Sequence, residues 1–192
     1  MFSSEGRING QHITTGFLKL ADFQTLTDAG GRMYDAPIFL YDAPNVRFPE
    51  LKSVARQMVA VHKVKAIFVD YLQIVAWEDS RLAKHEQVAA VSLGLKELAR
   101  ELKVPIVALS QLKRDAEGRE PDMADLDYSK QIEQDADAIV LIYHPKAKEG
   151  EEGRPSMLLV KKNRDGPKGV VMVKFQREYV RFYELEHERN AS

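Results

Sequence analysis

Apolar residues recur at intervals of three and four positions in three segments of the chain, which is the spacing of one face of an α-helix. These segments cover about residues 18–33, 49–62 and 84–102. The third is the most regular, with apolar side chains at Val88, Val91, Leu95, Leu98 and Leu102. Proline is favoured in the first turn of a helix, so Pro49 indicates where the second segment begins. The pattern therefore predicts three amphipathic helices.

Continuous apolar runs between these segments predict β-strands. The runs at 66–70, 105–109 and 138–142 lack polar alternation, which is typical of parallel strands buried on both faces. A shorter apolar run at 38–41, between two prolines, also predicts a strand. The polar stretch 113–128 contains glycine and proline and predicts a surface loop.

The last third of the chain has a different pattern. Short apolar segments at 157–161, 170–175 and 179–183 are joined by turns at Asp165-Gly166 and Arg177-Glu178. They predict an antiparallel edge on a mixed sheet. The alternation of helices and strands before them predicts one doubly wound α/β domain. Ligands bind such domains at the carboxyl ends of the parallel strands.

Composition and charge narrow the class of protein. The 192 residues include 28 Lys and Arg against 29 Asp and Glu, a net charge of −1, so any nucleic-acid contact must be local. The chain has no cysteine, which excludes disulfides, cysteine-ligated zinc and cysteine nucleophiles. No apolar run approaches the roughly 18 residues of a membrane helix, and the first residues lack the order of a signal peptide. We therefore expect a cytoplasmic protein that does not enter a membrane.

Polar side chains stand at the ends of two predicted strands. Asp70 ends the run at 66–70, and Ser110 and Gln111 follow the run at 105–109. A carboxylate in such a place can hold Mg²⁺ beside nucleotide phosphates, and an amide can sense a phosphate or orient a water. From position alone, a turn-forming aspartate and an ordinary polar strand end explain these residues at least as well.

A second group is the basic turn at 161–168, which carries four cations around a glycine and a proline. Cations on a rigid hairpin can stabilise phosphoryl oxygens or contact a nucleic-acid backbone, and a solvated turn is an equally good interpretation. Glu133, Asp135 and Asp137 would scatter around a helix, so they predict an acidic turn before a strand rather than a metal cluster. The five histidines show no ligand spacing and indicate no metal site.

Taken together, three stretches resemble the replicative DNA helicases of the DnaB type. Residues 68–73 look like the Walker B strand of that family, and residues 104–112 resemble its third helicase motif almost letter for letter. Residues 132–137, an apolar strand and then residues 162–167 resemble the segment that closes its motor domain. The likeness covers about residues 6–183. It implies a RecA-like P-loop NTPase core, with a largely parallel sheet flanked by helices and antiparallel carboxyl-terminal strands, within a single partial domain over residues 1–192.

The resemblance also implies roles for matched residues. Asp70 would be the Walker B acid that holds Mg²⁺ through water, and Gln111 would sense the γ-phosphate of ATP and relay its state toward DNA. Lys162 and Arg164 would reach the nucleotide of a neighbouring subunit, with Arg164 as an arginine finger. The family works as a hexameric ring of identical subunits that draws single-stranded DNA through its centre and unwinds the duplex during replication. Primase and loader proteins are the further partners that the resemblance implies.

The DNA-contacting loop would fall around residues 127–131. The family usually has Arg-Glu-Ser-Gly-Ser here, whereas this chain has an acidic residue in place of the arginine and Lys130 in place of the glycine. Lys130 could supply a phosphate contact, and Tyr128 could stack on a base. Ser129 and Gln131 complete the candidate DNA-binding residues.

The chain departs from the family in a second way, because G-x-x-x-x-G-K-S/T occurs nowhere in it. That loop cradles the β- and γ-phosphates. In the family it lies upstream of the matched region, together with the glutamate that activates water. We therefore expect a motor domain truncated at its amino end and unable to hydrolyse ATP by itself. By analogy the missing strand belongs between those at 106–109 and 138–142, so apolar sheet edges should be left unpaired and favour aggregation.

Three functions fit this sequence. The first is the carboxyl-terminal portion of an ATP-driven replicative DNA helicase. The second is another RecA-like enzyme, such as a recombinase-type ATPase that binds single-stranded DNA. The third is a naturally shortened, non-catalytic interaction subunit, which would offer Lys162 and Arg164 to a neighbour that owns the P-loop. A gene with an upstream helical domain and a P-loop would favour the first, and a reading frame that begins at Met1 would favour the third.

Overall fold

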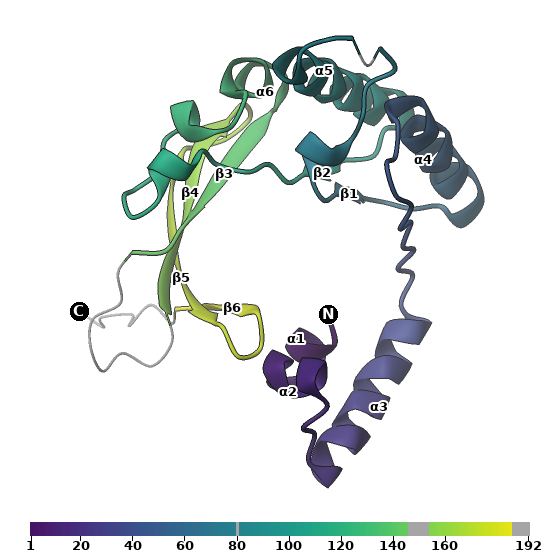
Figure 1. Cartoon of the computed structure of the whole chain (residues 1–192), viewed down its shortest axis with the longest axis vertical. Helices are drawn as coiled ribbons and strands as arrows, with labels where there is room; N and C mark the ends of the chain where they lie inside the picture. Colours follow the sequence, from purple (N-terminus) through teal and green to yellow (C-terminus); the bar gives the residue numbers. More distant parts are fainter. Residues whose placement is uncertain (80, 146–153, 186–192) are drawn as a thin grey trace. The chain divides into compact units, whose positions relative to one another are not determined.

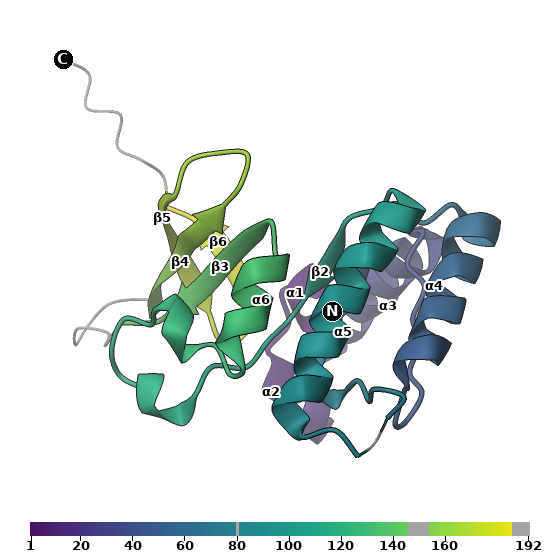
Figure 2. The same ribbon diagram turned by 90° about the horizontal axis from the view of Figure 1, so that it is seen from above.

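The computed structural model describes residues 1–79, 81–145 and 154–185 (Figures 1 and 2). The chain divides into two compact units. The first unit comprises 1–40, 140–160 and 169–192, and the second comprises 41–139 and 161–168. All the candidate nucleotide-site and DNA-binding residues named above therefore lie in the second unit.

Two long helices of the second unit run side by side, α4 (Phe48–His62) and α5 (Lys84–Leu102) (Figures 1 and 2). The bounds of α5 are those that the apolar spacing predicts, and α4 begins one residue before Pro49. Four of the five predicted apolar positions of α5 are buried, namely Val88, Val91, Leu95 and Leu98. Both helices end at a lysine in the left-handed region, Lys63 (φ 56°) and Lys103 (φ 55°), whose N–H bonds back to a carbonyl of its helix.

The parallel sheet of this unit pairs β1 (Ile67–Val69) with β2 (Ile106–Ala108), in the register Ile67↔Ile106. Among the described residues no further strand joins this pair. Phe68 is 71% exposed and Val107 is 47% exposed, whereas Val69 is buried. The prediction that these runs are buried on both faces is therefore wrong, because the unit covers only one face of the two strands.

The predicted surface loop between β2 and α6 (Ser129–Asp135) is more ordered than its polar sequence suggests. It contains two 3₁₀ turns, η2 (Arg114–Ala116) and η3 (Met123–Asp125). Ala116, Asp125 and Leu126 are buried, and Leu126 forms an antiparallel bridge with Leu112. The segment is thus packed against the end of β2, and only part of it is a solvated loop.

Four strands form the second sheet, in the order β3-β4-β5-β6. They are β3 (Ala138–Tyr143), β4 (Arg154–Asn163), β5 (Gly169–Gln176) and β6 (Arg181–Glu184). β4 pairs with β5 and β5 with β6, both antiparallel, which confirms the hairpins predicted from the sequence. β3 buries Ile139 and Leu141 but leaves Val140 and Ile142 about half exposed, so it too has only one covered face.

In the first unit, α1 (Phe2–Gly6), α2 (Gly10–Thr15) and α3 (Leu20–Asp35) precede a stretch without a strand. The strand predicted at 38–41 is therefore wrong; Ile38 and Leu40 are exposed, and no described strand pairs with them. The short helices are tied to the turn before β6, since the Gly10 N–H donates to the Glu178 carbonyl at 2.8 Å. None of the helices in the described ranges combines the length and the apolar character needed to cross a bilayer.

Candidate functional site

The carboxyl ends of β1 and β2 lie together because the strands are parallel and in register. The Leu109 N–H donates to the Val69 carbonyl at 2.9 Å, which extends the ladder to the end of β1. Asp70 follows β1 directly, and Ser110 and Gln111 follow β2. The structure thus brings these candidate residues to one edge of the sheet.

The side chains at this edge differ in whether they form hydrogen bonds. Gln73 donates through Nε2 to the Ser110 hydroxyl at 3.0 Å, while its buried Oε1 has no hydrogen-bond partner. Asp70 and Gln111 are exposed, and the Asp70–Tyr71 peptide bond is cis. Within the described part of the chain, Asp70 takes part in no ion pair. The edge therefore presents a carboxylate and an amide to whatever binds there.

The oxygen atoms of Asp70 and Gln111 are compatible with a metal ion that takes few protein ligands. No group of three or more possible ligands among His, Cys, Asp and Glu occurs in the described residues, so a closed metal site is not formed there. Mg²⁺ beside phosphates needs only one or two carboxylates, because water and phosphate oxygens complete its shell. Asp70 supplies such a carboxylate. The oxygen donors at this edge are therefore suited to Mg²⁺ held with a bound nucleotide.

The basic turn joins β4 to β5. Its Lys162 is half-buried and donates through Nζ to the Glu133 carbonyl at 2.6 Å, in the last turn of α6. A lysine in this position satisfies a carbonyl that the helix itself leaves unpaired. At the tip of the turn, a Cβ on Gly166 would lie 2.6 Å from Nδ2 of Asn163, so only glycine fits without a shift.

Arg164 is held by Asp137, the residue before β3. The Arg164 N–H donates to the Asp137 carbonyl at 2.8 Å, and Nη1 of Arg164 lies 3.0 Å from Oδ1 of Asp137. The second carboxylate oxygen of Asp137 accepts from Lys96 of α5. The Lys96 hydrogen bond, together with the positive charge of Arg164, lowers the pKa of Asp137 from its ordinary value.

No hydrogen bond or ion pair between described residues joins this turn to Asp70 or Gln111. The candidate residues thus form two separate groups, one at the strand ends and one on the basic turn.

The candidate DNA-binding residues surround the start of α6. Tyr128 precedes the helix with φ 61° and is half-buried, while Lys130 is exposed. Gln131 donates to Asp135 at 2.8 Å; Ser129 begins the helix, and its side chain lies outside the described residues. The Asp127 N–H donates to the Gln111 carbonyl at 3.2 Å, so this segment is bonded directly to the end of β2.

Sequence reasoning missed the ion pair that organises the preceding loop. Arg119 reaches both carboxylate oxygens of Asp125, at 2.6 and 2.8 Å, and the Asp125 side chain is 9% exposed. The Arg119 guanidinium, with a further bond from the Asp122 N–H, lowers the pKa of Asp125 to about 2. The one signal in the sequence was the spacing of Asp122 and Asp125, which form a capping box around η3.

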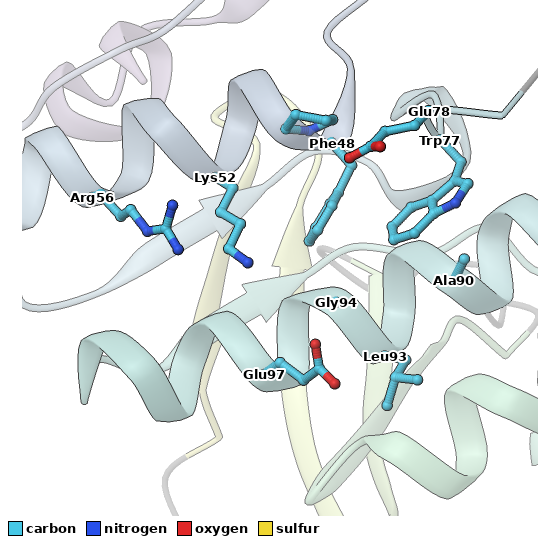
Figure 3. Close-up of a pocket in the computed structure, with 10 residues that line it drawn as sticks. Phe48, Lys52, Arg56, Trp77, Glu78, Ala90, Leu93, Gly94 and Glu97 are labelled. Carbon is cyan, nitrogen blue, oxygen red and sulfur yellow. The ribbon is translucent and has the colours of Figure 1, made fainter.

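A groove of about 420 Å³ between α4 and α5 was also missed (Figure 3). Phe48 and Trp77 stack in it with ring centroids 5.0 Å apart. Gly94 is required at this crossing, because a Cβ there would overlap the Phe48 ring. Lys52 on α4 and Glu97 on α5 give the groove a lining of mixed charge.

Almost the whole of this chain is similar to known proteins. A family model described as the DnaB-like helicase C-terminal domain matches residues 1–184. The chain belongs to this family. Its residues are 41% identical over 182 positions to the replicative DNA helicase DnaB of Treponema pallidum, covering 95% of this chain and 40% of that protein. They are 36% identical to the DnaB of Geobacillus stearothermophilus, covering 97% of this chain and 42% of that protein.

Two solved structures confirm the fold class of this DnaB-like domain. One, described as an ATPase domain, superposes with a TM-score of 0.85 at 32% identity, over 96% of this chain and 68% of that one. The other, a DnaB-like replicative helicase described with its interactions with primase, gives 0.86 at 32% identity, over 96% of this chain and 46% of that one. The RecA-like α/β prediction is therefore correct. The chain spans about two fifths of the length of the curated relatives.

Proposed function

We propose that this chain is part of an ATP-dependent replicative DNA helicase, and that residues 1–192 form part of one RecA-like motor domain. The family match over residues 1–184 carries the proposal. The whole protein would hydrolyse ATP, move along single-stranded DNA and unwind the duplex during replication in the cytoplasm. Assembly as a hexameric ring of identical subunits, with primase and a loader protein as partners, belongs to the same proposal.

Asp70 and Gln111 would serve the bound nucleotide. The exposed Asp70 carboxylate would hold Mg²⁺ through water, and Mg²⁺ when bound would neutralise charge on the phosphates of ATP. Gln111 would detect the γ-phosphate with its exposed amide. The bond from the Asp127 N–H to the Gln111 carbonyl supports a relay, because through it a shift of the Gln111 backbone would act on the segment at 127–131.

Lys162 and Arg164 would act on the nucleotide of the neighbouring subunit. Arg164 is about half exposed on the turn between β4 and β5, so part of its guanidinium is accessible to a second chain. A cation placed against a transferring phosphoryl group stabilises the charge that develops there. Lys162 would contribute a second positive charge after leaving the carbonyl of Glu133.

DNA contact would fall on the segment before and within the first turn of α6. Lys130 is exposed and available to a phosphate, and Tyr128 would offer a ring for stacking. Ser129 and Gln131 complete the proposed DNA-binding set.

Two other functions stand beside this proposal. The first is a non-catalytic subunit that would supply Arg164 to a neighbour that carries the phosphate-binding loop. The second is a recombinase-type ATPase, which would bind single-stranded DNA with turnover but without unwinding.

The test compares two proteins, the 192-residue chain and a parent protein that carries these residues behind a P-loop. ATP turnover and strand displacement are measured with and without single-stranded DNA. We expect DNA-stimulated turnover and unwinding from the parent, no turnover from the chain alone, and loss of both activities in Asp70→Asn. The matched control is Asp42→Asn, an exposed aspartate away from the strand ends. Turnover without unwinding would support the recombinase-type alternative, and robust turnover by the chain alone would contradict the need for an upstream P-loop.

A further inference from the structure

Asp137, directly before β3, is bonded to two other parts of the second unit, the basic turn and α5. Its carbonyl accepts from the Arg164 N–H at 2.8 Å, and its Oδ1 lies 3.0 Å from Nη1 of Arg164. Its Oδ2 accepts from Nζ of Lys96, which is only 16% exposed. A single residue therefore fixes both the backbone and the side chain of Arg164 relative to α5.

We propose that Asp137 is a positioning residue for Arg164, holding its guanidinium in one orientation on the basic turn so that it is ready for a neighbouring subunit's nucleotide. This inference rests on the proposed role of Arg164. A long arginine side chain on an unsupported turn would sample many rotamers, and misplacement by about 1 Å can lower a rate by up to about 100-fold. The backbone bond and the ion pair with Asp137 would bias the side chain toward one orientation before the neighbour arrives.

Because both side chains of the Arg164–Asp137 pair are exposed, the pair can orient the Arg164 guanidinium without hiding it from a ligand. The side chains of Arg164 and Asp137 are 48% and 52% exposed, and ion pairs in such places are weak. A triphosphate carries several negative charges against one on Asp137, so it can take over the outer face of the guanidinium. The bond from the Arg164 N–H to the Asp137 carbonyl is independent of side-chain charge and keeps the base of the side chain in place.

Lys96 restrains the side chain of Asp137. It contacts Asp137 from the largely buried side of α5, so the carboxylate that faces Arg164 is anchored at its other oxygen. Asp135, two residues earlier, provides a natural contrast. Its carboxylate accepts from Ser92 and Gln131, both at 2.8 Å, and within the described part of the chain no hydrogen bond or ion pair joins it to the basic turn. The two aspartates are thus similarly tied to the surrounding helices but differ in their contact with Arg164.

The experiment measures DNA-stimulated ATP turnover in the P-loop-bearing parent protein carrying Asp137→Asn, Asp137→Glu, or the control Asp135→Asn. We expect Asp137→Asn to lower kcat by about 10-fold while leaving the KM for ATP within about 2-fold, because orientation and not nucleotide affinity is lost. Asp137→Glu, which keeps the carboxylate, should recover part of kcat. Thermal melting of all three variants separates this effect from unfolding. Equal loss of kcat in Asp135→Asn would overturn the positioning role.

A double-variant comparison tests whether Asp137 acts through Arg164. In an Arg164→Lys background, the further change Asp137→Asn should alter kcat by less than about 2-fold, since coupled residues are not additive. A full further loss would contradict the inference. If Arg164→Lys and Arg164→Ala both keep wild-type turnover, the proposed finger role fails; if Arg164→Ala is inactive while Asp137→Asn is fully active, only the positioning role fails.

Discussion

The strand-end group and the basic turn differ in how their polar side chains are satisfied. At the ends of β1 and β2, the backbone ladder fixes the chain while Asp70 and Gln111 remain exposed. On the turn, Lys162 is bonded to the Glu133 carbonyl and Arg164 is paired with Asp137. The first group is open to a ligand as it stands. The side chains of the second group already have internal partners, so binding of an external ligand there would compete with those bonds.

The largest effect should come from Arg164→Ala in the P-loop-bearing parent. We expect DNA-stimulated turnover to fall by about 1,000-fold or more, as for arginine fingers in other NTPases, while nucleotide binding is retained. Steady-state ATPase assays and titration with a fluorescent nucleotide measure the two quantities. Arg177→Ala, at the exposed turn before β6, is the matched control and should behave as wild type. Unchanged turnover in Arg164→Ala would refute the finger role.

Asp125→Asn should destabilise the loop that supports the strand-end group. We expect Tm to fall by several degrees near neutral pH, because the buried partner of Arg119 loses its charge. The folded pKa of about 2 lies below the ordinary 3.8, so this stabilisation is full above about pH 5 and is lost as pH falls through the folded pKa. Urea unfolding of both proteins between about pH 7 and pH 2 should therefore show the difference shrinking in acid.

The matched control for that series is Asp115→Asn, an exposed aspartate of the same loop. It should leave Tm unchanged. A difference between wild type and Asp125→Asn that stays constant down to about pH 2 would show that the Arg119 ion pair is not its source.

Lys162→Met tests whether the basic turn is held as the structure shows. Removal of the ammonium leaves the Glu133 carbonyl without this donor and should lower the free energy of unfolding by about 1 kcal/mol. Chemical denaturation of the 192-residue chain measures it. Lys168→Met, exposed on the same turn, should change nothing. Equal stability of the two variants would mean that the Lys162 bond contributes little and that the side chain is free to leave α6.

The smallest effect should come from Lys130→Ala. We expect weaker binding of single-stranded DNA and a salt slope reduced by about 1, the loss of one phosphate contact. Fluorescence anisotropy with an oligothymidine at several salt concentrations provides the slope. Lys65→Ala, exposed in the loop before β1, serves as the control. A slope identical to that of wild type would remove Lys130 from the DNA path.

Local pattern predicted the three long helices and the hairpins, but it missed the short helices α1 and α2, and Glu133 and Asp135 lie in helix α6 rather than in the predicted acidic turn. The spacing of Val88 to Leu102 gave both ends of α5, and the turns at 165–166 and 177–178 gave the hairpins of β4 to β6. The errors in the strands share one physical cause. The runs at 38–41, 66–70 and 138–142 are apolar enough for buried strands, but burial and pairing depend on neighbours that a local window does not contain. Phe68 and Val140 are therefore exposed despite their sequence context.

By itself the sequence determined the three long helices, the hairpins and the chemical identity of the candidate residues, because periodicity and turn chemistry act over a few positions. The motifs around Asp70, Gln111 and Arg164 likewise indicated the family that the comparisons confirm. Only the tertiary structure decided the partners: Arg119 with Asp125, and Arg164 with Asp137 and Lys96. Ion pairs of this kind join segments up to tens of residues apart, and each charged residue has many possible partners in the sequence. Which partner it contacts depends on how the helices and strands pack, and no local pattern encodes that packing.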